Sequence, residues 1–223
     1  WDSYVPAYLS EQNTELLPIV GQEDYDAQLW SLFGQYTHKI GDFDLSAGVR
    51  HDEHDAYRDR LSFNTGMVWT PVSEWTFKLL YGTAYRTPFA SQLIDEDEPD
   101  PEKITTFNCR ASWQPSRRIG LSLTGFVNRL SNHIMEDPYA GLSIPNHQNV
   151  RGFELEARVV PKADLELGMN FTVMENDGPD ETYNYLDYSF IRPDGTIEQV
   201  YTDIIYPYDM GPELLINFTG RWH

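Results

Sequence analysis

The sequence is poor in features that define several common protein classes. Its single cysteine, Cys109, excludes an internal disulfide and a cluster of thiolate metal ligands. No apolar run approaches the roughly 20 residues that a membrane-spanning helix needs. Basic residues are scarce: 16 Lys and Arg stand against 35 Asp and Glu, which gives a net charge of −19. Because nucleic-acid backbones are densely negative, this imbalance argues against a nucleic-acid partner.

The two ends of the sequence also lack expected features. Trp1 opens an acidic, Pro-containing stretch that has no basic start, apolar core or small-residue cleavage site of a signal peptide. Arg221-Trp222-His223 follows directly on an alternating run, without a closing turn or a polar tail. We therefore expect these 223 residues to be a section of a longer chain.

What the sequence does contain is apolar and polar residues alternating with a period of two. In residues 43–50, Phe43, Leu45 and Val49 interleave with polar residues and Gly48, which places one set on each face of an extended strand. Similar runs predict strands at 61–69, 75–86, 106–113, 119–128, 153–159, 165–172 and 214–222, and a further one near 29–39. The pattern predicts about nine strands of roughly 9 to 13 residues, each with an apolar and a polar face.

The connections between these strands alternate in length. Tight turns rich in turn-forming residues are predicted at 41–42, 71–74, 115–118 and 161–164. Long polar loops are predicted at 52–60, 87–103, 131–148 and 175–211. Short turns and long loops therefore lie at opposite ends of the strands.

This combination is typical of a transmembrane β-barrel, whose strands need an apolar lipid face, a polar inner face, and short turns on one side only. Trp69, Trp75, Trp113 and Trp222 lie near the tight turns, where an aromatic girdle is expected. A soluble sandwich also alternates, but it has no reason to place every short turn on one edge.

The fold class predicted is therefore all-β, an antiparallel transmembrane β-barrel section. Residues 1–26 are interpreted as an extracellular loop segment and residues 27–223 as the partial barrel. In a ring of nine antiparallel strands the first and last would run parallel, so we expect a larger barrel.

Three stretches resemble the barrel of TonB-dependent outer-membrane receptors. Residues 81–89 resemble the family's strand end before an extracellular loop, and residues 101–107 resemble its Pro-Glu-Lys re-entry into the next strand. Residues 125–134 with 149–157 resemble the paired strands that carry its Arg-Gly-x-Glu-x-Glu signature. The matching positions are Tyr81, Gly82, Arg86, Pro88, Pro101, Glu102, Lys103, Arg151, Gly152, Glu154 and Glu156.

The resemblance implies a barrel of about 22 strands in the outer membrane of a Gram-negative bacterium, closed by an N-terminal plug. It implies no enzymatic activity and no required cofactor. It implies capture of a scarce small-molecule ligand, such as a metal chelate or siderophore, and import energised by the TonB complex through the plug. The sequence lacks the plug and the segment that contacts TonB. Lipid and lipopolysaccharide are the other expected partners.

Two sets of residues are candidate metal ligands. His51, Asp52, His54 and Asp55 form the densest set of nitrogen and oxygen donors, but convergence of both histidines would need a turn, which favours a solvated loop tip. Residues 95–100 are rich in carboxylates suited to loop-bound calcium, and such a loop could also meet lipopolysaccharide through bridging divalent ions. This run lacks the glycine and spacing of a calcium loop, which favours a solvated acidic loop.

Other residues are candidates for ligand contact. Arg86, with Arg110, Arg151 and Arg158, is expected on the polar face, pairing with Glu154 and Glu156, docking the plug or touching an anionic ligand. Tyrosines in the longest loop would stack on an aromatic ligand or pack the loop on itself: Tyr183, Tyr185, Tyr188 and Tyr201, with Phe190, Tyr206 and Tyr208.

Three other functions compete with a transporter. A barrel hydrolase would use His51 and Asp55 as general base and partner. A passive porin or adhesin would have no upstream plug, and a scaffold would use the barrel mainly as a partner-binding wall.

Overall fold

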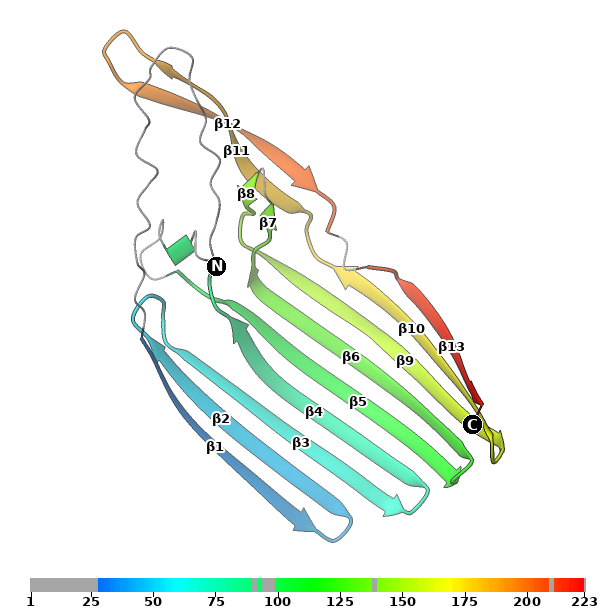
Figure 1. Cartoon of the computed structure of the whole chain (residues 1–223). Coiled ribbons are helices and arrows are strands. Elements are labelled where there is room, and N and C mark those ends of the chain that lie inside the picture. Colours follow the sequence, from blue (N-terminus) through cyan, green and yellow to red (C-terminus); the bar gives the residue numbers. More distant parts are fainter. Residues whose placement is uncertain (1–27, 90–91, 94–98, 138–139, 209–210, 223) are drawn as a thin grey trace.

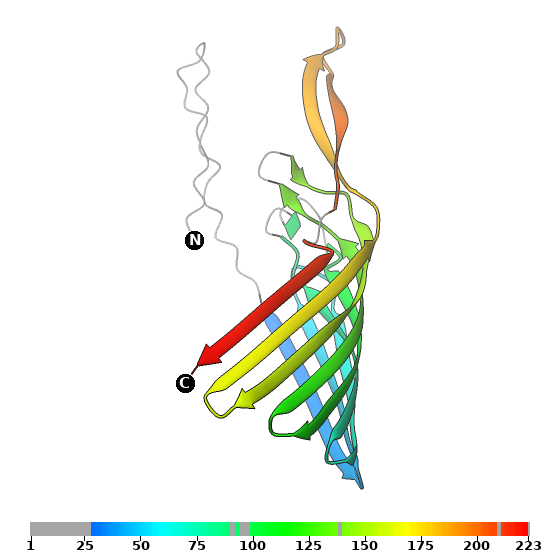
Figure 2. The ribbon, with the colours of Figure 1, turned by 90° about the vertical axis from the view of Figure 1, so that its right-hand side faces the viewer.

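The protein is described by a computed structural model that covers residues 28–89, 92–93, 99–137, 140–208 and 211–222. Nine strands form one antiparallel sheet in the order β1-β2-β3-β4-β5-β6-β9-β10-β13, which is curved (Figures 1 and 2). These strands are β1 (Leu29–Ile40), β2 (Phe43–His54), β3 (Arg60–Val72), β4 (Trp75–Arg86), β5 (Glu102–Ser116), β6 (Ile119–His133), β9 (Asn146–Lys162), β10 (Leu165–Asp177) and β13 (Leu214–Trp222). The prediction of about nine antiparallel strands is confirmed.

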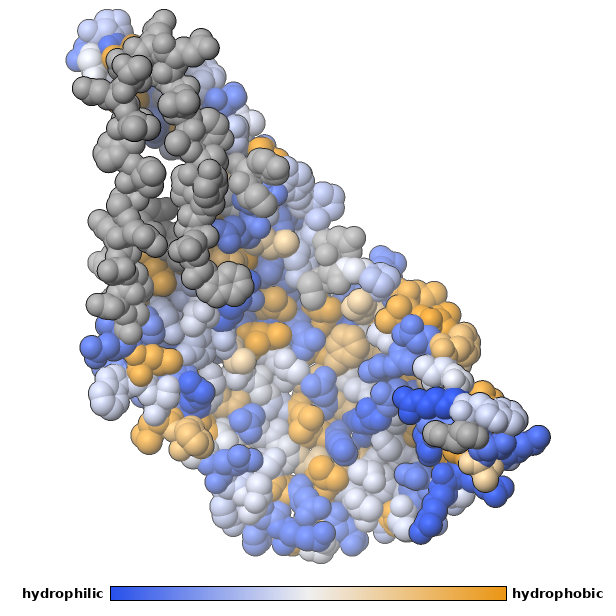
Figure 3. Space-filling model, in the orientation of Figure 1, coloured by the Kyte–Doolittle hydropathy of each residue, from blue (hydrophilic) through white to orange (hydrophobic). Residues whose placement is uncertain are grey.

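The register of the strands separates two faces. One continuous row of directly opposed residues runs Leu45, Met67, Leu79, Cys109, Gly125, Phe153, Val173 and Leu214. A row on the other face, three residues farther along each strand, runs Gly48, Asn64, Gly82, Thr106, Asn128, Val150 and Asn176. We call these the apolar face and the polar face. In the view of Figure 3, hydrophilic residues lie among apolar ones across the sheet.

The side chains on the apolar face are apolar only over part of the length of the strands. We call this part of the face the apolar band. Near the tight turns the band begins with aromatic rings whose centroids lie close together: Phe43 and Trp69 at 5.7 Å, Trp69 and Phe77 at 5.3 Å, and Trp75 and Trp113 at 6.2 Å. Toward the other end, its last residues on three neighbouring strands are Phe107, Val127 and Phe153. The aromatic belt matches the girdle of a barrel wall at a membrane interface.

All four tight turns lie at one end of the sheet, the turn end. The other end, the loop end, carries the connections at 55–59, 87–101, 134–145 and 178–213. The β6–β9 connection contains a small hairpin, β7 (Glu136–Asp137) and β8 (Gly141–Leu142). The last contains a longer one, β11 (Glu181–Ile191) and β12 (Ile197–Tyr206), which projects beyond the sheet (Figure 2).

These connections differ from the predicted loops in one consistent way. Strands β2, β6 and β10 continue beyond the residues where apolar alternation stops, and β9 begins before it. Backbone pairing continues there because ladder hydrogen bonds do not depend on side-chain polarity. The predicted loop segment 1–26 and most of the acidic run 95–100 lie outside the described residues.

Candidate functional site

Four ionisable side chains from four elements meet at the loop end. Arg86 ends β4, Glu102 begins β5, His133 ends β6 and Glu181 begins β11. A Glu102 carboxylate oxygen lies 2.9 Å from Arg86 Nη2 and 2.8 Å from His133 Nδ1. The other ring nitrogen, His133 Nε2, lies 3.3 Å from Glu181 Oε1. We call these four residues the loop-end cluster; it ties the base of the long hairpin to the sheet.

Three of the four members of the loop-end cluster are shielded from water, whereas the Arg86 side chain is 45% exposed. The side chains of Glu102, His133 and Glu181 are 13%, 9% and 2% exposed, respectively. On β5 the apolar band ends at Phe107, so Glu102 lies about 16 Å farther along the strand, outside the membrane-spanning part. Burial alone would raise the pKa of Glu102, but the hydrogen bond to His133 and the charge of Arg86 outweigh it and lower this pKa.

Amide side chains complete the anchoring of the hairpin. Asn146 Nδ2 donates to Glu181 Oε2 at 2.9 Å, and Gln148 Nε2 donates to the carbonyl of Pro179 at 2.8 Å. Asn176 Nδ2 donates to Gln148 Oε1 at 3.0 Å. Gln148 has no exposed surface, so its amide is satisfied within the protein.

Arg86 is on the polar face, as predicted, but its guanidinium is already engaged. Besides Glu102, it donates to the carbonyl of Ile134 at 2.6 Å and lies 4.5 Å above the ring of Phe89. These contacts indicate a structural role, because those with Glu102 and Ile134 connect β4 to separate loop-end segments. Contact between Arg86 and an anionic ligand stays a prediction.

The tyrosines predicted to contact ligand lie on the β11–β12 hairpin. A register shift between Leu186 and Tyr188 keeps Tyr188 on the same face as Tyr183 and Tyr185. Tyr201 is opposite Leu186, on the other face. The aromatic residues that share the first face, which we call the hairpin aromatic face, are Tyr183, Tyr185, Tyr188, Phe190 and Tyr206.

Along β11, the exposure of the tyrosines on the hairpin aromatic face rises from Tyr183 through Tyr185 to Tyr188. Tyr183 is 3% exposed and packs edge-on against Tyr206, with centroids 5.5 Å apart. Tyr185 and Tyr188 are 42% and 56% exposed. Burial, together with the charges of Glu181 and Asp137, raises the pKa of Tyr183, so its hydroxyl stays protonated at neutral pH. Tyr183 is therefore packed at the base of the hairpin, while Tyr185 and Tyr188 farther out, and Tyr206 on the β12 side, are accessible.

The predicted metal ligands near residue 52 are engaged with other groups. Asp52 is buried and accepts hydrogen bonds from Ser31 Oγ at 2.5 Å, Arg50 Nε at 2.8 Å and Tyr85 Oη at 2.9 Å.

The two candidate histidines differ in position. His51 neighbours Asp52 in β2 and therefore points to the opposite face, whereas the His54 ring stacks on Tyr57 with centroids 3.9 Å apart. Within the described ranges, no group of three or more His, Cys, Asp or Glu side chains is arranged to hold a metal. The geometry gives the metal hypothesis no support.

Several family-motif positions have a clear physical role. A Cβ on Gly152 would lie 2.3 Å from the carbonyl oxygen of Val173 and 2.7 Å from the Phe126 ring, so a side chain does not fit there. The ring of Tyr81 lies on the apolar face, 5.7 Å from that of Phe63. Pro88 follows β4, and buried Pro101 directly precedes β5.

The predicted pairing of arginines with Glu154 and Glu156 is only partly right. Arg110 pairs with Glu156, which also accepts a hydrogen bond from Ser122 at 2.8 Å. Glu154 instead accepts a hydrogen bond from Asn170. Arg158 pairs with Glu166, with nitrogen and oxygen 2.8 Å apart.

The prediction that Arg151 lies on the polar face is wrong. The register sets Arg151 opposite Val127 and Glu175, on the apolar face just above the band, and its guanidinium pairs with Glu175 at 3.1 Å. Alternation counted from Phe153 gives the same answer, since two residues separate the positions.

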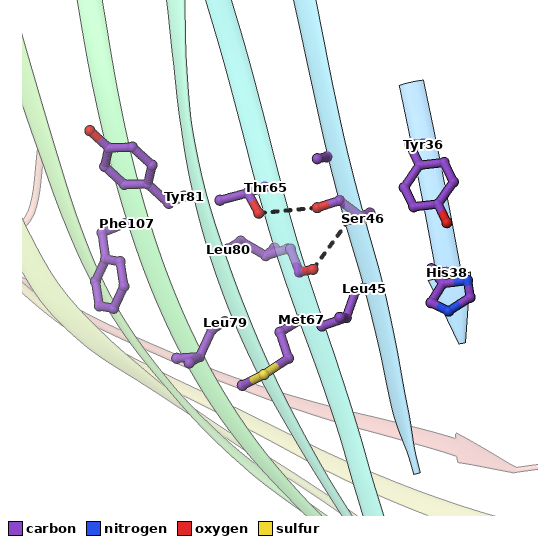
Figure 4. A pocket seen from close by; sticks show the side chains of 12 residues that line it. Tyr36, His38, Leu45, Ser46, Thr65, Met67, Leu79, Leu80, Tyr81 and Phe107 are labelled. Atoms are coloured by element: carbon purple, nitrogen blue, oxygen red, sulfur yellow. Dashed lines mark hydrogen bonds between the residues drawn. The ribbon is translucent and has the colours of Figure 1, made fainter. Parts of the chain in front are cut away.

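Two cavities lie in different chemical surroundings. A groove of about 380 Å³ crosses the apolar face, where Tyr36 and His38 flank one side, Phe107 the other, and Met67 lies between them (Figure 4). At the loop end, a cavity of about 270 Å³ is lined mainly by polar residues, among them Glu175, Asn176, Asp180 and Glu213. The first lies on the apolar face, and the second lies near the base of the hairpin.

His133, Glu181, Asn146 and Gln148 were not identified from sequence. They lie at the ends of strands beyond the apolar alternation, where period-two analysis carries no signal. Their proximity depends on contacts between residues 31 to 35 positions apart. The donor-rich run 146–149, which follows Pro145, was the available signal.

Solved structures share this fold. The FrpB iron transporter from Neisseria meningitidis matches with a TM-score of 0.58 and 12% identity, over 88% of this chain and 38% of that one. The ferric-catecholate import receptor Fiu from E. coli K12 gives 0.61 and 13%, over 88% and 32%. The siderophore receptor PirA from Pseudomonas aeruginosa gives 0.61 and 21%, over 71% and 33%. The chain thus spans 32% to 38% of the length of these proteins.

The family comparison covers nearly the whole sequence. Residues 2–222 match the family described as TonB dependent receptor-like, beta-barrel. The nine-stranded alternating sheet, with its turns at one end and its hairpins at the other, is the structure expected of such a barrel wall. The protein belongs to the TonB-dependent receptor β-barrel family.

Proposed function

We propose that this chain is the barrel part of an outer-membrane receptor that captures a scarce metal chelate and imports it with energy from the TonB complex. Family membership supports this proposal, as do the iron transporter and siderophore receptors that share its fold. Family membership also supports the further proposals of a plug, contact with TonB and location in a Gram-negative outer membrane. The apolar band supports contact with membrane lipid.

The observation that best supports ligand capture is the hairpin aromatic face. It stands beyond the sheet, where a ligand arrives from outside the cell, and its tyrosines are fixed at one end by the loop-end cluster (Figure 2). Aromatic rings stack on planar aromatic groups at small entropic cost, because few side-chain torsions must be ordered. Tyr185 and Tyr188 are therefore proposed to stack on an aromatic chelate, with catecholates as the chemical class.

Paired substitutions test this role in the complete receptor. Tyr185→Ala with Tyr188→Ala should weaken binding of radioactive iron(III) catecholate to whole cells about tenfold, through loss of two ring contacts. Tyr201→Ala is the matched control, since it removes an exposed ring from the opposite face of the same hairpin. Equal affinity in both variants and the unmodified receptor would reject the stacking role.

No observation in the described ranges favours a barrel hydrolase. Asp55, the partner proposed for His51, accepts a hydrogen bond from the backbone nitrogen of Gln28. The proposal requires no cofactor. Calcium binding by the acidic loop stays a proposal for residues that lie mostly outside the described ranges; Asp100, which is described, pairs with Arg60 at 2.8 Å. A bound calcium would give lipopolysaccharide phosphates a bridge to this loop.

A further inference from the structure

The composition of the apolar face changes sharply at the upper edge of the apolar band. Above Phe107, Val127 and Phe153, the register places polar side chains on this same face. One row of opposed residues consists of Lys103, Ser131 and His147, and the row below it contains Arg129 and Asn149. We call these five residues the donor patch.

The donor patch is compact. Directly opposed side chains have Cβ atoms about 5 Å apart, and diagonal neighbours such as Lys103 and Arg129 about 7 Å. All five side chains can donate hydrogen bonds, and the register puts no carboxylate between them. Lys103, Arg129 and His147 are exposed. Asp177 borders the patch on the β10 side: it lies directly opposite Asn149, and its backbone carbonyl accepts a hydrogen bond from Asn149 Nδ2 at 3.1 Å.

The two strongest cations of the patch are Lys103 and Arg129. Within the described ranges, neither Lys103 nor Arg129 forms an ion pair or a side-chain hydrogen bond, whereas Arg110 and Arg158 on the polar face are both paired. Arg151, next to the patch, is shared with Glu175. Among the described residues, no carboxylate therefore competes with an anion for Lys103 and Arg129.

An apolar groove of about 500 Å³ runs immediately below the patch. Phe107, Cys109, Val127 and Phe153 line it, and Arg151 lies at its upper end. Gly125 forms part of its wall, and a Cβ added there would have no atom within 4 Å. The absence of a side chain at Gly125 leaves the groove open.

From this geometry we infer that the donor patch and the groove bind a phosphate-bearing lipid of the surrounding outer leaflet. The phosphate is held by Lys103 and Arg129, and an acyl chain lies in the groove over Gly125. The charge is complementary, because two free cations meet a phosphate at the height where the apolar band ends. The inference depends on the membrane location proposed above, but not on the imported ligand.

Bound lipid can be measured on the complete receptor extracted in mild detergent from its native membrane. We expect phosphorylated lipid to co-purify with the unmodified receptor, and Lys103→Gln with Arg129→Gln to lower the molar ratio about tenfold. Lys39→Gln with Arg192→Gln removes the same charge at the turn end and on the hairpin, and should leave the ratio unchanged. Equal ratios in all three proteins, or equal losses in both variants, would overturn the inference.

A second measurement separates headgroup from acyl chain. Delipidated receptor should bind diphosphoryl lipid A about tenfold more tightly than its dephosphorylated form, and Lys103→Gln with Arg129→Gln should abolish this preference. Gly125→Leu fills the groove and should weaken both forms by the same factor, whereas Lys103→Arg with Arg129→Lys keeps the preference. Equal affinity of the unmodified receptor for both forms, or full competition by inorganic phosphate, would contradict binding of the lipid. Import of iron(III) catecholate plays no part in either readout.

Discussion

The apolar band and the loop end are built from the same strands but are held in different ways. Within the band, apolar and polar residues alternate on every strand, and each side chain mainly contacts the residues directly opposite it. At the loop end, a few buried charges join residues that are far apart in sequence: Arg86 with Ile134, Glu102 with His133, and Asn146 with Glu181.

This difference predicts different tolerance to change. An apolar residue that faces lipid can be exchanged for another at little cost, since lipid adapts to its shape. A buried carboxylate that loses its partner keeps its desolvation cost, so a single substitution at the loop end releases a whole segment. We therefore expect the apolar band to tolerate most single substitutions, and the loop end, with the hairpin that it anchors, to tolerate few.

The largest expected effect lies within the sheet, at Gly152, where the packing leaves no space for a side chain. Gly152→Ala forces a Cβ against the carbonyl of Val173, and we expect it to lower the free energy of unfolding by about 3 kcal/mol. Gly120→Ala, in a strand of the same sheet and with no atom near its added Cβ, should change it by less than about 0.5 kcal/mol. Urea unfolding monitored by electrophoretic mobility of unboiled samples distinguishes them, and equal midpoints would refute the packing argument.

The sheet was largely predictable from sequence, because its strands and turns depend on residues that are close together in the chain. Alternation at Phe43, Leu45 and Val49 shows which face each residue takes, and a turn such as Gly41-Asp42 shows where the strand reverses. The face of Arg151 was predictable as well, by counting two residues from Phe153. The ends of β6 and β9 could not be predicted, because both of their faces are polar there. Backbone pairing between polar residues produces no pattern of alternating hydropathy.

The next largest effect is expected at the loop end, at Glu181, the most deeply buried member of the loop-end cluster. Glu181→Ala leaves Asn146 without its acceptor and removes the carboxylate that faces His133 Nε2, and we expect it to destabilise the hairpin locally by about 2 kcal/mol. Hydrogen exchange over residues 181–206 should accelerate about 30-fold, while exchange in β3 and β4 stays constant.

Glu198→Ala provides the matched control on the same hairpin. Its carboxylate pairs with Arg192 near the surface, and such pairs contribute little. Acceleration of the hairpin to the same extent in both variants would show that the loop-end cluster does not anchor it.

The candidate site was only partly predictable from sequence. The tyrosine-rich composition identified the hairpin, but the bulge that aligns Tyr188 with Tyr183 and Tyr185 has no signature in hydropathy. The roles of His133 and Glu181 depend on where the hairpin folds back, which is a long-range property. Sequence thus showed which residues were unusual, but not which of them would meet.

The smallest expected effect is a dependence of hairpin anchoring on pH through Glu102. Its pKa is lower in the folded protein than the ordinary value of 4.5, so the unfolded segment binds the proton more readily. The stabilisation is therefore complete above the ordinary value and is lost as pH falls through the lowered one. We expect about 1 kcal/mol of hairpin stability to disappear in this window, seen as faster exchange at residues 181–206 after correction for the intrinsic rate. Glu102→Gln should flatten that component of the profile, because the amide cannot titrate. An unchanged acid dependence in this variant would assign the effect to another carboxylate, with Glu181 the first to substitute.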